Sequence, residues 1–270
     1  MTLSKLDSVT ESFGKSDLMP VLFIGHGNPM NAIEENPFTR SLQAMAQAIQ
    51  PKPKAILVVS AHWLTRGSFV CVNPKPETIH DFGGFPQELF DVQYPARGAP
   101  GVAREVEKLA TGVQEDAQWG LDHGAWTILK HLYPAADIPV FQLSIDYAQP
   151  MQYHFDLGTQ LHELRKRGVL IIGSGNIVHN LRMFFSKSDD KPFDWAIEFD
   201  EWVAKQVDSR NFENLIHYEK AGASAKLSVP TVDHYVPMLY SLALAGKNEP
   251  IQYTYNSVEA SMSMRAFRIG

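Results

Sequence analysis

The sequence predicts an α/β fold in which one mostly parallel sheet lies between two layers of helices. Short apolar runs rich in β-branched residues alternate with helical patterns along residues 18–270, as in parallel sheets covered on both faces. The run at 55–60 is apolar at almost every position, as expected of a buried central strand. A chain of 270 residues with 44% hydrophobic residues is ample for a full core. We therefore predict a single three-layer domain at 18–270, preceded by a flexible tail at 1–17.

Five strands are expected from short apolar runs bounded by glycine, proline or polar residues. The first run leads directly into His26, and the fourth leads into Ser174-Gly175-Asn176. The last run is shorter and more polar, which is typical of an edge strand. The five segments are 20–25, 55–60, 138–145, 169–173 and 251–255.

Helices are expected where apolar residues recur at helical spacing. The first begins with Asn36 as N-cap and Pro37 as the first helical residue. Gly112 closes the second, and Pro134 follows the third. The predicted helices are 36–49, 98–112, 125–133, 151–168, 194–207 and 235–245.

Composition narrows the class of protein. The formal net charge is −6 without long runs of charge, which argues against a nucleic-acid partner. The single cysteine, Cys71, cannot form an internal disulfide and fits a reducing cytoplasm. Residues 1–16 lack the apolar core of a signal peptide, and no apolar run approaches the roughly 18 residues needed to cross a bilayer. We expect a cytoplasmic protein without a membrane partner.

The placement of the histidines is the most informative feature. His26, His62 and His179 each follow a strand-like run and stand beside small residues that permit sharp turns. His234 stands just before an apolar helical stretch. Ligands collect outside the carboxyl ends of strands in open α/β sheets. Several imidazoles at that edge indicate a metal centre.

A structural role is the alternative for any single histidine, since most histidines lie at the surface or are hydrogen-bonded in the core. We assign that role to four others, in helical or strand-like patterns: His131, His154, His162 and His217. His26, His62 and His179 share one local context, because each follows a strand-like run and stands beside small residues. This agreement favours a metal site over coincidence.

The residue types restrict the metal. With one cysteine, a sulfur-rich structural zinc site is excluded. No His-Glu-x-x-His motif is present, so the common metalloprotease arrangement is absent. Three or four imidazoles suit zinc, iron or copper. Ligands dispersed over several strand ends favour an open, catalytic site.

Five motifs occur in an order that resembles a known family. The resemblance is to the class III extradiol ring-cleaving dioxygenases of LigB type, in their 4,5-DOPA extradiol dioxygenase branch, and it covers about residues 19–270. The motifs are Gly25-His26-Gly27-Asn28-Pro29-Met30, Ser60-Ala61-His62-Trp63, Ile79-His80-Asp81-Phe82-Gly83-Gly84-Phe85-Pro86, Asp122-His123-Gly124-Ala125-Trp126 and Gly173-Ser174-Gly175-Asn176-Ile177-Val178-His179-Asn180.

The resemblance implies roles position by position. His26 and His62 match the first two metal ligands, and His234 matches the third, where other class III enzymes use a glutamate. Asp233 could supply a carboxylate instead, but the pattern of this branch places histidine at the ligand position. His179 matches the acid/base histidine, and His123 matches the one that contacts substrate and bound oxygen.

The resemblance also implies the cofactor. It is one divalent metal ion, with Fe(II) for activity and Zn(II) as an alternative bound form in purified protein. If His179 coordinates the ion directly, a four-histidine tetrahedral zinc site results. The glycine- and aromatic-rich segment 81–86 is expected to form either a wall or lid over a flat ring or a structured surface loop.

The implied function is cleavage of a catechol ring, DOPA-like or a related small phenolic, with O2 as co-substrate. A zinc-dependent amide or ester hydrolase with His179 as base is one alternative. A non-catalytic metal-binding member of the same fold is the other. The sequence leaves the oligomeric state open.

Overall fold

One eight-stranded sheet organises the chain, which the computed structural model describes over residues 18–186 and 191–270. The predicted tail at 1–17 lies outside the described residues. The strand order is β4-β3-β5-β2-β6-β1-β10-β7. The strands are β1 (Val21–Gly25), β2 (Ala55–Thr65), β3 (Ser68–Cys71), β4 (Val113–Asp116), β5 (Val140–Asp146), β6 (Val169–Gly175), β7 (Ile251–Tyr255) and β10 (Ala266–Ile269).

The centre of the sheet is parallel and its flanks are mixed. Strands β5, β2, β6 and β1 pair in parallel. Strands β10 and β7 continue the sheet in antiparallel fashion on one side, and β3 pairs antiparallel with β5 on the other. The predicted fold class, a mostly parallel sheet between helices, is confirmed.

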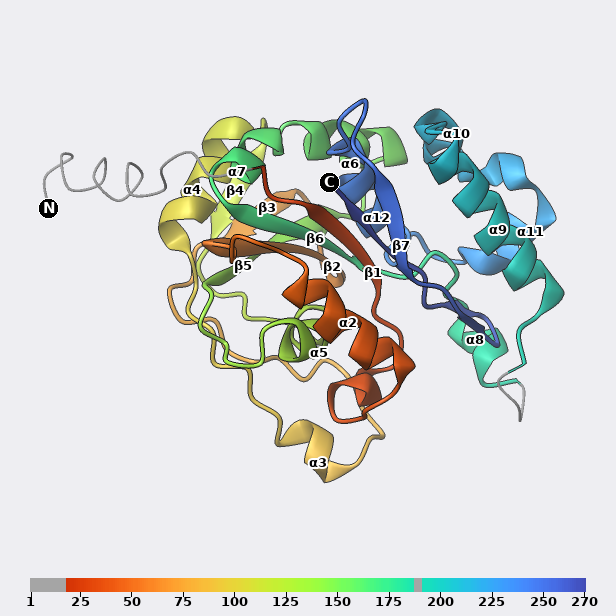
Figure 1. Cartoon of the computed structure of the whole chain (residues 1–270), viewed down its shortest axis with the longest axis horizontal. Coiled ribbons are helices and arrows are strands. Elements are labelled where there is room, and N and C mark those ends of the chain that lie inside the picture. Colours follow the sequence, from red (N-terminus) through yellow and green to blue (C-terminus); the bar gives the residue numbers. More distant parts are fainter. Residues whose placement is uncertain (1–17, 187–190) are drawn as a thin grey trace, which may run out of the picture.

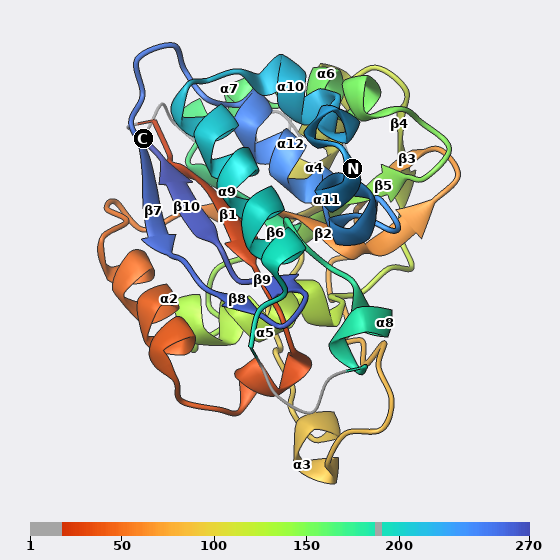
Figure 2. The ribbon, with the colours of Figure 1, turned by 90° about the vertical axis from the view of Figure 1, so that its right-hand side faces the viewer.

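Helices cover both faces of the sheet (Figure 1). Helices α2 and α5 pack together on one face, whereas α6 and α12 pack together on the other. Helix α3 lies at the lower edge of Figure 2, and α8 lies above it at the right-hand side. The helices are η1 (Pro29–Ala32), α2 (Pro37–Gln47), α3 (Gln87–Phe90), α4 (Pro100–Leu109), α5 (His123–Leu132), α6 (Met151–Thr159), α7 (His162–Lys166), α8 (Leu181–Phe184), α9 (Asp194–Asp208), α10 (Phe212–Ile216), η2 (Tyr218–Ala221), α11 (Ala223–Ser228) and α12 (Val236–Ala243).

Successive side chains of each strand point to opposite faces of the sheet, so the hydrophobic core has two halves. In β1, Val21 and Phe23 join the core under α6, α9 and α12, whereas Leu22 and Ile24 join the core under α2 and α5. All four side chains are fully buried. Full burial of such side chains contributes roughly 1.5–3 kcal/mol each. This two-sided burial explains why the central strands are continuous apolar runs.

Two predicted elements differ most from the structure. The helix predicted at 151–168 is two helices, because Gln160 and Leu161 donate backbone hydrogen bonds to the third residue before them and tighten the chain between α6 and α7. The strand predicted at 55–60 continues to Thr65, with an irregularity in its pairing to β5 between Val59 and Leu64. His62 therefore lies inside β2 rather than after it.

Several short elements have no counterpart in the sequence predictions. Strands β3 and β4 have four residues each and carry little apolar alternation. Strand β10 is also four residues long, and a small hairpin joins β8 (Val258–Glu259) to β9 (Met262–Ser263). Their positions depend on tertiary pairing, which local periodicity does not encode. Among the described helices, none combines the length and apolarity needed to cross a bilayer.

The start of α12 lies very close to the end of β6. A Cβ atom on Gly173 would stand 2.2 Å from the carbonyl oxygen of Pro237, and one on Gly175 would stand 2.2 Å from that of His234. No side chain fits at either position. These two glycines therefore determine how closely α12 approaches the sheet.

Replacing Gly173 by alanine should destabilise the protein. The added Cβ would overlap backbone atoms of α12, and relief of such overpacking costs about 1–3 kcal/mol or more. Gly83→Ala is the matched control, because its added Cβ would meet no heavy atom within 4 Å. Urea unfolding of both variants measures the difference. Equal stability of the two variants would contradict the close packing of α12 on β6.

Candidate metal centre

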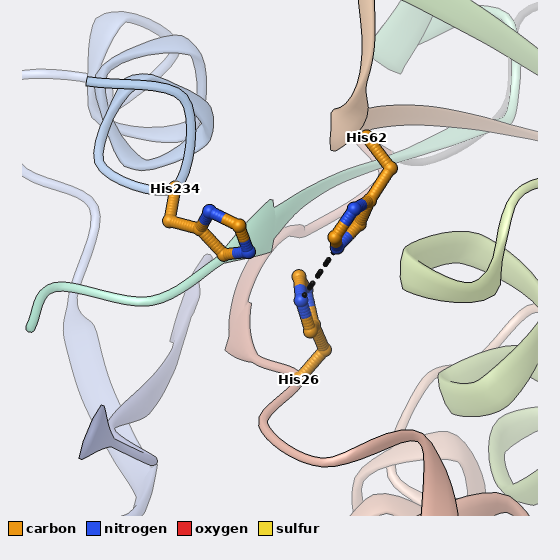
Figure 3. Close-up of side chains that lie close together, drawn as sticks. All are labelled: His26, His62 and His234. Atoms are coloured by element: carbon orange, nitrogen blue, oxygen red, sulfur yellow. Dashed lines mark hydrogen bonds between the residues drawn. The ribbon is translucent and has the colours of Figure 1, made fainter. Parts of the chain in front are cut away.

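Three of the predicted histidines meet at the carboxyl end of the parallel strands. His26 follows β1 directly, His62 lies in the outer part of β2, and His234 stands two residues before α12. Figure 3 shows their three rings pointing toward a common centre. Segments that are far apart in the sequence thus deliver one imidazole each.

The spacing of the ring nitrogens fits a metal ion. One nitrogen from each of His26, His62 and His234 lies within 4.8 Å of the other two. Nε2 of His26 and Nε2 of His62 are 3.1 Å apart. Two nitrogens bound at about 2.0–2.1 Å to one tetrahedral ion would be roughly 3.4 Å apart. The observed separation is close to that value.

A hydrogen-bond chain determines which nitrogen of His26 faces the cluster. The hydroxyl of Ser174 donates to the carbonyl oxygen of Gly124 at 2.5 Å. Its oxygen therefore accepts from Nδ1 of His26, which lies 3.0 Å away. With its proton on Nδ1, His26 keeps the lone pair on Nε2 available for a ligand.

Asp233 orients His234 in the same way. Its Oδ2 lies 2.5 Å from Nδ1 of His234, so this contact favours a proton on Nδ1 and a free lone pair on Nε2. Burial acts to raise the pKa of Asp233, but its hydrogen bond and charge contact with His234 outweigh burial and lower the pKa. The structure thus places the carboxylate on the far side of the ring, whereas the nitrogen of His234 joins the cluster.

Two histidines of the cluster, His26 and His62, are held in the neutral form that binds metal. Burial lowers the pKa of His26 well below 6.5, and the neighbouring histidines lower it further. The same causes, in the same order, lower the pKa of His62. Both imidazoles are therefore unprotonated near neutral pH. Neutral nitrogen donors without a thiolate suit Zn(II) or Fe(II), so this donor set fits a divalent ion.

His179 lies beside the cluster but outside the set of three close nitrogens. Its ring stacks on that of His234, with centroids 3.5 Å apart and an interplanar angle of 8°. Its backbone N–H donates to the carbonyl oxygen of Ser228. Burial, and next the proximity of His234, lower the pKa of His179 to about 3. Its imidazole is therefore unprotonated at neutral pH.

His123 approaches the cluster from the opposite side. It is the first residue of α5, whose N-cap Asp122 accepts a hydrogen bond from the backbone of Ala125. Its ring centroid lies 3.8 Å from that of His62 and 5.7 Å from that of His26. The cap of a helix thus positions the fifth imidazole of the site.

Asp81 connects His123 to His62. Its Oδ1 accepts a hydrogen bond from the backbone N–H of His123 at 2.9 Å. Its Oδ2 lies 3.0 Å from Nδ1 of His123 and 3.5 Å from Nδ1 of His62. Burial acts to raise the pKa of Asp81, but the contacts with His123 outweigh it and lower the pKa. A carboxylate therefore faces two imidazoles at once.

A cavity of about 490 Å³ opens above the histidines. The five histidines line it together with two aromatic walls, one from segment 81–86 and one from the region of α8. Phe82 packs edge-on against His123, with centroids 5.6 Å apart. The volume lies within the usual range for small-molecule sites. Segment 81–86, expected to be a wall or a surface loop, lines this cavity.

Sequence reasoning missed the roles of four residues in the site. Asp81 stands in a glycine-rich segment and Ser174 ends a strand, so neither carries a local mark of its contact with a histidine. Phe184 and Phe185 belong to a four-residue helix and its C-cap. For Ser174, the available signal in the sequence was that it is a polar residue beside glycine at the end of a strand.

The histidines assigned to structural roles have other partners. Nε2 of His131 lies 2.7 Å from the carbonyl oxygen of Asn31, and Nδ1 of His154 lies 3.1 Å from the hydroxyl of Tyr240. His217 pairs with glutamates at the surface, and His162 begins α7. None of the four lines the cavity.

Comparisons with known proteins agree on one family. Residues 20–266 match the family described as "Catalytic LigB subunit of aromatic ring-opening dioxygenase". A "4,5-DOPA dioxygenase extradiol" of Escherichia coli (strain K12) is 43% identical over 265 residues, which cover 94% of this chain and 96% of that relative. A protein of the same name from Beta vulgaris is 38% identical over 250 residues, covering 90% and 93%. The crystal structure of an uncharacterized protein from Escherichia coli K12 superposes with a TM-score of 0.82 at 40% identity, covering 93% of this chain and all 100% of that one.

Metal-free protein should lose stability as the pH falls from 7 to 5. The native pKa of His179 is about 3, whereas that of an unfolded histidine is about 6.5, so below pH 6.5 only the unfolded state takes up this proton. The expected loss of unfolding free energy from His179 is at most about 2 kcal/mol over this interval. Urea unfolding of chelated protein at both pH values measures it.

His179→Gln should reduce this loss, whereas His217→Gln, whose side chain is 45% exposed, should not change it. An undiminished loss in His179→Gln would contradict the lowered pKa.

Proposed function

The chain belongs to the family of catalytic LigB subunits of aromatic ring-opening dioxygenases, and we propose that it opens a catechol ring with O2 at one divalent metal ion. The resemblance found in the five sequence motifs is thereby confirmed. One observation carries the proposal: the imidazoles of His26, His62 and His234 converge at the floor of an aromatic-walled cavity.

The substrate class follows from the relatives and from the cavity. Relatives 43% and 38% identical to this chain are named 4,5-DOPA dioxygenase extradiol, and DOPA is a catechol. A cavity of about 490 Å³ with phenylalanine walls accommodates a small aromatic ring. We therefore propose a small catechol, DOPA-like or a related phenolic, as the substrate.

His26, His62 and His234 would hold the metal, which is Fe(II) in the active enzyme. A bound redox-active ion would lower the pKa of the catechol hydroxyls and would pass electrons from the catechol to O2. Zinc follows iron in the usual order of increasing affinity, so purified protein is expected to contain zinc as well.

The surrounding residues move protons and orient the ring. His179, neutral at pH 7, accepts a hydroxyl proton of the catechol on an imidazole nitrogen and returns it when the ring opens. Asp81 holds His123 by its backbone and its Nδ1, which leaves Nε2 of His123 as a hydrogen-bond acceptor or donor toward the substrate. Phe82 and Phe85 exclude water from one face of the cavity.

We also propose that residues 18–270 form one catalytic domain. The histidines of the site come from positions 26 to 234, and β10 near residue 269 pairs with β1 near residue 21. The whole described chain therefore contributes to one site.

Activity should depend on the identity of the ion. Chelated protein reconstituted with Fe(II) under nitrogen should consume oxygen and form a yellow ring-opened product when catechol and air are admitted. Zinc-loaded protein should bind catechol without turning it over, because zinc has no redox chemistry. Oxygen electrode and absorbance measurements decide between the two. Equal ring cleavage by both forms, or hydrolysis of esters without oxygen, would contradict the proposal.

The ligand histidines and His179 should differ when replaced. His26→Ala should lose most of its metal, because an open site has few ligands to spare. His179→Ala should keep Fe(II) but slow single-turnover cleavage by about 10²–10⁴, the range for a general acid/base. His131→Ala, outside the cavity, is the control. Loss of iron from His179→Ala as complete as from His26→Ala would make His179 a ligand.

A further inference from the structure

A polar residue interrupts the apolar run of the central strand β5. Gln142 is fully buried and lies between Phe141 and Leu143, which join the core under α6, α9 and α12. Because successive side chains of a strand alternate, Gln142 points to the other face of the sheet, which α2 and α5 cover. A buried amide without hydrogen-bond partners is costly, so the contacts of Gln142 must account for its place in the strand.

Gln142 makes two hydrogen bonds, both to Asp122. Its Nε2 donates to Oδ2 of Asp122 at 2.7 Å, and its Oε1 accepts from the backbone N–H of Asp122 at 3.1 Å. Asp122 is fully buried as well and is the N-cap of α5. Gln142 therefore holds both the backbone and the side chain of the residue that precedes His123.

The second carboxylate oxygen of Asp122 connects the cap to β2. The hydroxyl of Ser60 donates to Oδ1 of Asp122 at 2.6 Å, and the Ser60 oxygen accepts from the backbone N–H of His62 at 3.2 Å. The same Oδ1 accepts from the backbone N–H of Ala125 at 3.1 Å. Asp122 thus binds the first turn of α5 to the strand that carries a proposed metal ligand.

The first turn of α5 packs closely against the histidine cluster. A Cβ atom on Gly124 would stand 2.5 Å from Oγ of Ser60 and 2.9 Å from Cδ2 of His62. The carbonyl oxygen of Gly124 accepts from the hydroxyl of Ser174, whose oxygen accepts from Nδ1 of His26. The turn that carries one imidazole therefore contacts a second and reaches a third through a serine.

We propose that Gln142 is a positioning residue for ring opening, and that it acts through Asp122 on His123. Neither Gln142 nor Asp122 lines the cavity, so neither touches the substrate. The inference rests on the proposed function, in which His123 meets the catechol. By holding the cap of α5 from the sheet, Gln142 determines where that imidazole stands relative to the metal ligands.

A purely structural role for the buried contacts is the competing interpretation. The rest of α5 is held by apolar packing, since Ile128 and Leu129 are buried in the core. Loss of the contacts between Gln142 and Asp122 should therefore loosen the first turn and leave the helix in place. A displacement of a substrate-contacting group by about 1 Å can cost about 100-fold in rate.

Exchange of donor and acceptor across the contact tests the proposal. In Asp122→Asn the new amide nitrogen opposes Nε2 of Gln142, and turning the Gln142 amide over would oppose its Nε2 to the backbone N–H of residue 122. One hydrogen bond is lost in either case. Combining Asp122→Asn with Gln142→Glu provides an acceptor for both donors and keeps volume and net charge. Gln142→Leu removes both contacts at similar volume.

Single-turnover cleavage of catechol by the Fe(II)-loaded variants is the first measurement. Asp122→Asn and Gln142→Leu should each keep their iron and slow cleavage by about 100-fold, whereas the exchanged double variant should recover most of the rate. Ile128→Val is the matched control in the same helix. It removes one buried methyl group, so it should lower the urea midpoint and leave the rate unchanged.

A second genetic background separates positioning from stability. In His123→Ala protein, Asp122→Asn should slow cleavage no further, because the imidazole that it positions is absent. A purely structural role predicts the same additional slowing in both backgrounds.

Amide hydrogen exchange of the chelated protein gives a measurement without turnover. Exchange in residues 122–127 should be faster in Asp122→Asn and Gln142→Leu than in the unchanged protein. It should return to the original rate in the double variant.

The outcomes separate this inference from the proposed function. Unchanged cleavage in Asp122→Asn and Gln142→Leu, no recovery in the double variant, or equal slowing in the His123→Ala background would overturn the positioning role and leave the dioxygenase intact. Absence of oxygen uptake by the unchanged Fe(II)-loaded protein with every catechol would overturn the proposed function itself.

Discussion

The site depends on the close approach of the chain before α12 to the end of β6. Gly175 leaves no room for a Cβ beneath the carbonyl oxygen of His234, and the backbone N–H of Asn176 donates to that oxygen at 2.8 Å. The imidazole that arrives from farthest along the sequence is thus positioned by backbone contacts, which are stiffer than side-chain packing. A preorganised metal site, as proposed for these histidines, needs support of this kind from the surrounding residues.

The clustering of histidines in one cavity destabilises the folded state. Five imidazoles share one cavity, and burial together with mutual repulsion keeps His26, His62 and His179 uncharged. Two carboxylates at the edge of the cluster, Asp81 and Asp233, offset part of this cost through their contacts with His123 and His234. Functional sites often carry such local destabilisation, and the apolar core on both sides of the sheet compensates for it.

The sequence predicted those elements whose apolar or helical pattern is visible within one short segment. The central strands are apolar runs because they are buried on both faces, and His26 was found because it directly follows such a run. His62 was found for a partly wrong reason, since its strand continues past it. His234 has no strand before it; its place before an apolar helical stretch marked it as a candidate, and the family resemblance gave it the role of third ligand. Asp81 and the phenylalanines of α8 reach the site through tertiary folding of short segments, which no periodicity records.

The pairing of β1 with β10 has a consequence for the newborn chain. Strand β1 is synthesised well before its two neighbours in the sheet, β6 and β10, because both lie far downstream in the sequence. Until then its apolar residues and both of its edges remain open to other chains, which favours aggregation. Translation must also pass His234 before the cluster is complete. The three histidines of the proposed metal site therefore meet only after His234 has been made, so an ion that needs all three is bound after that residue is synthesised.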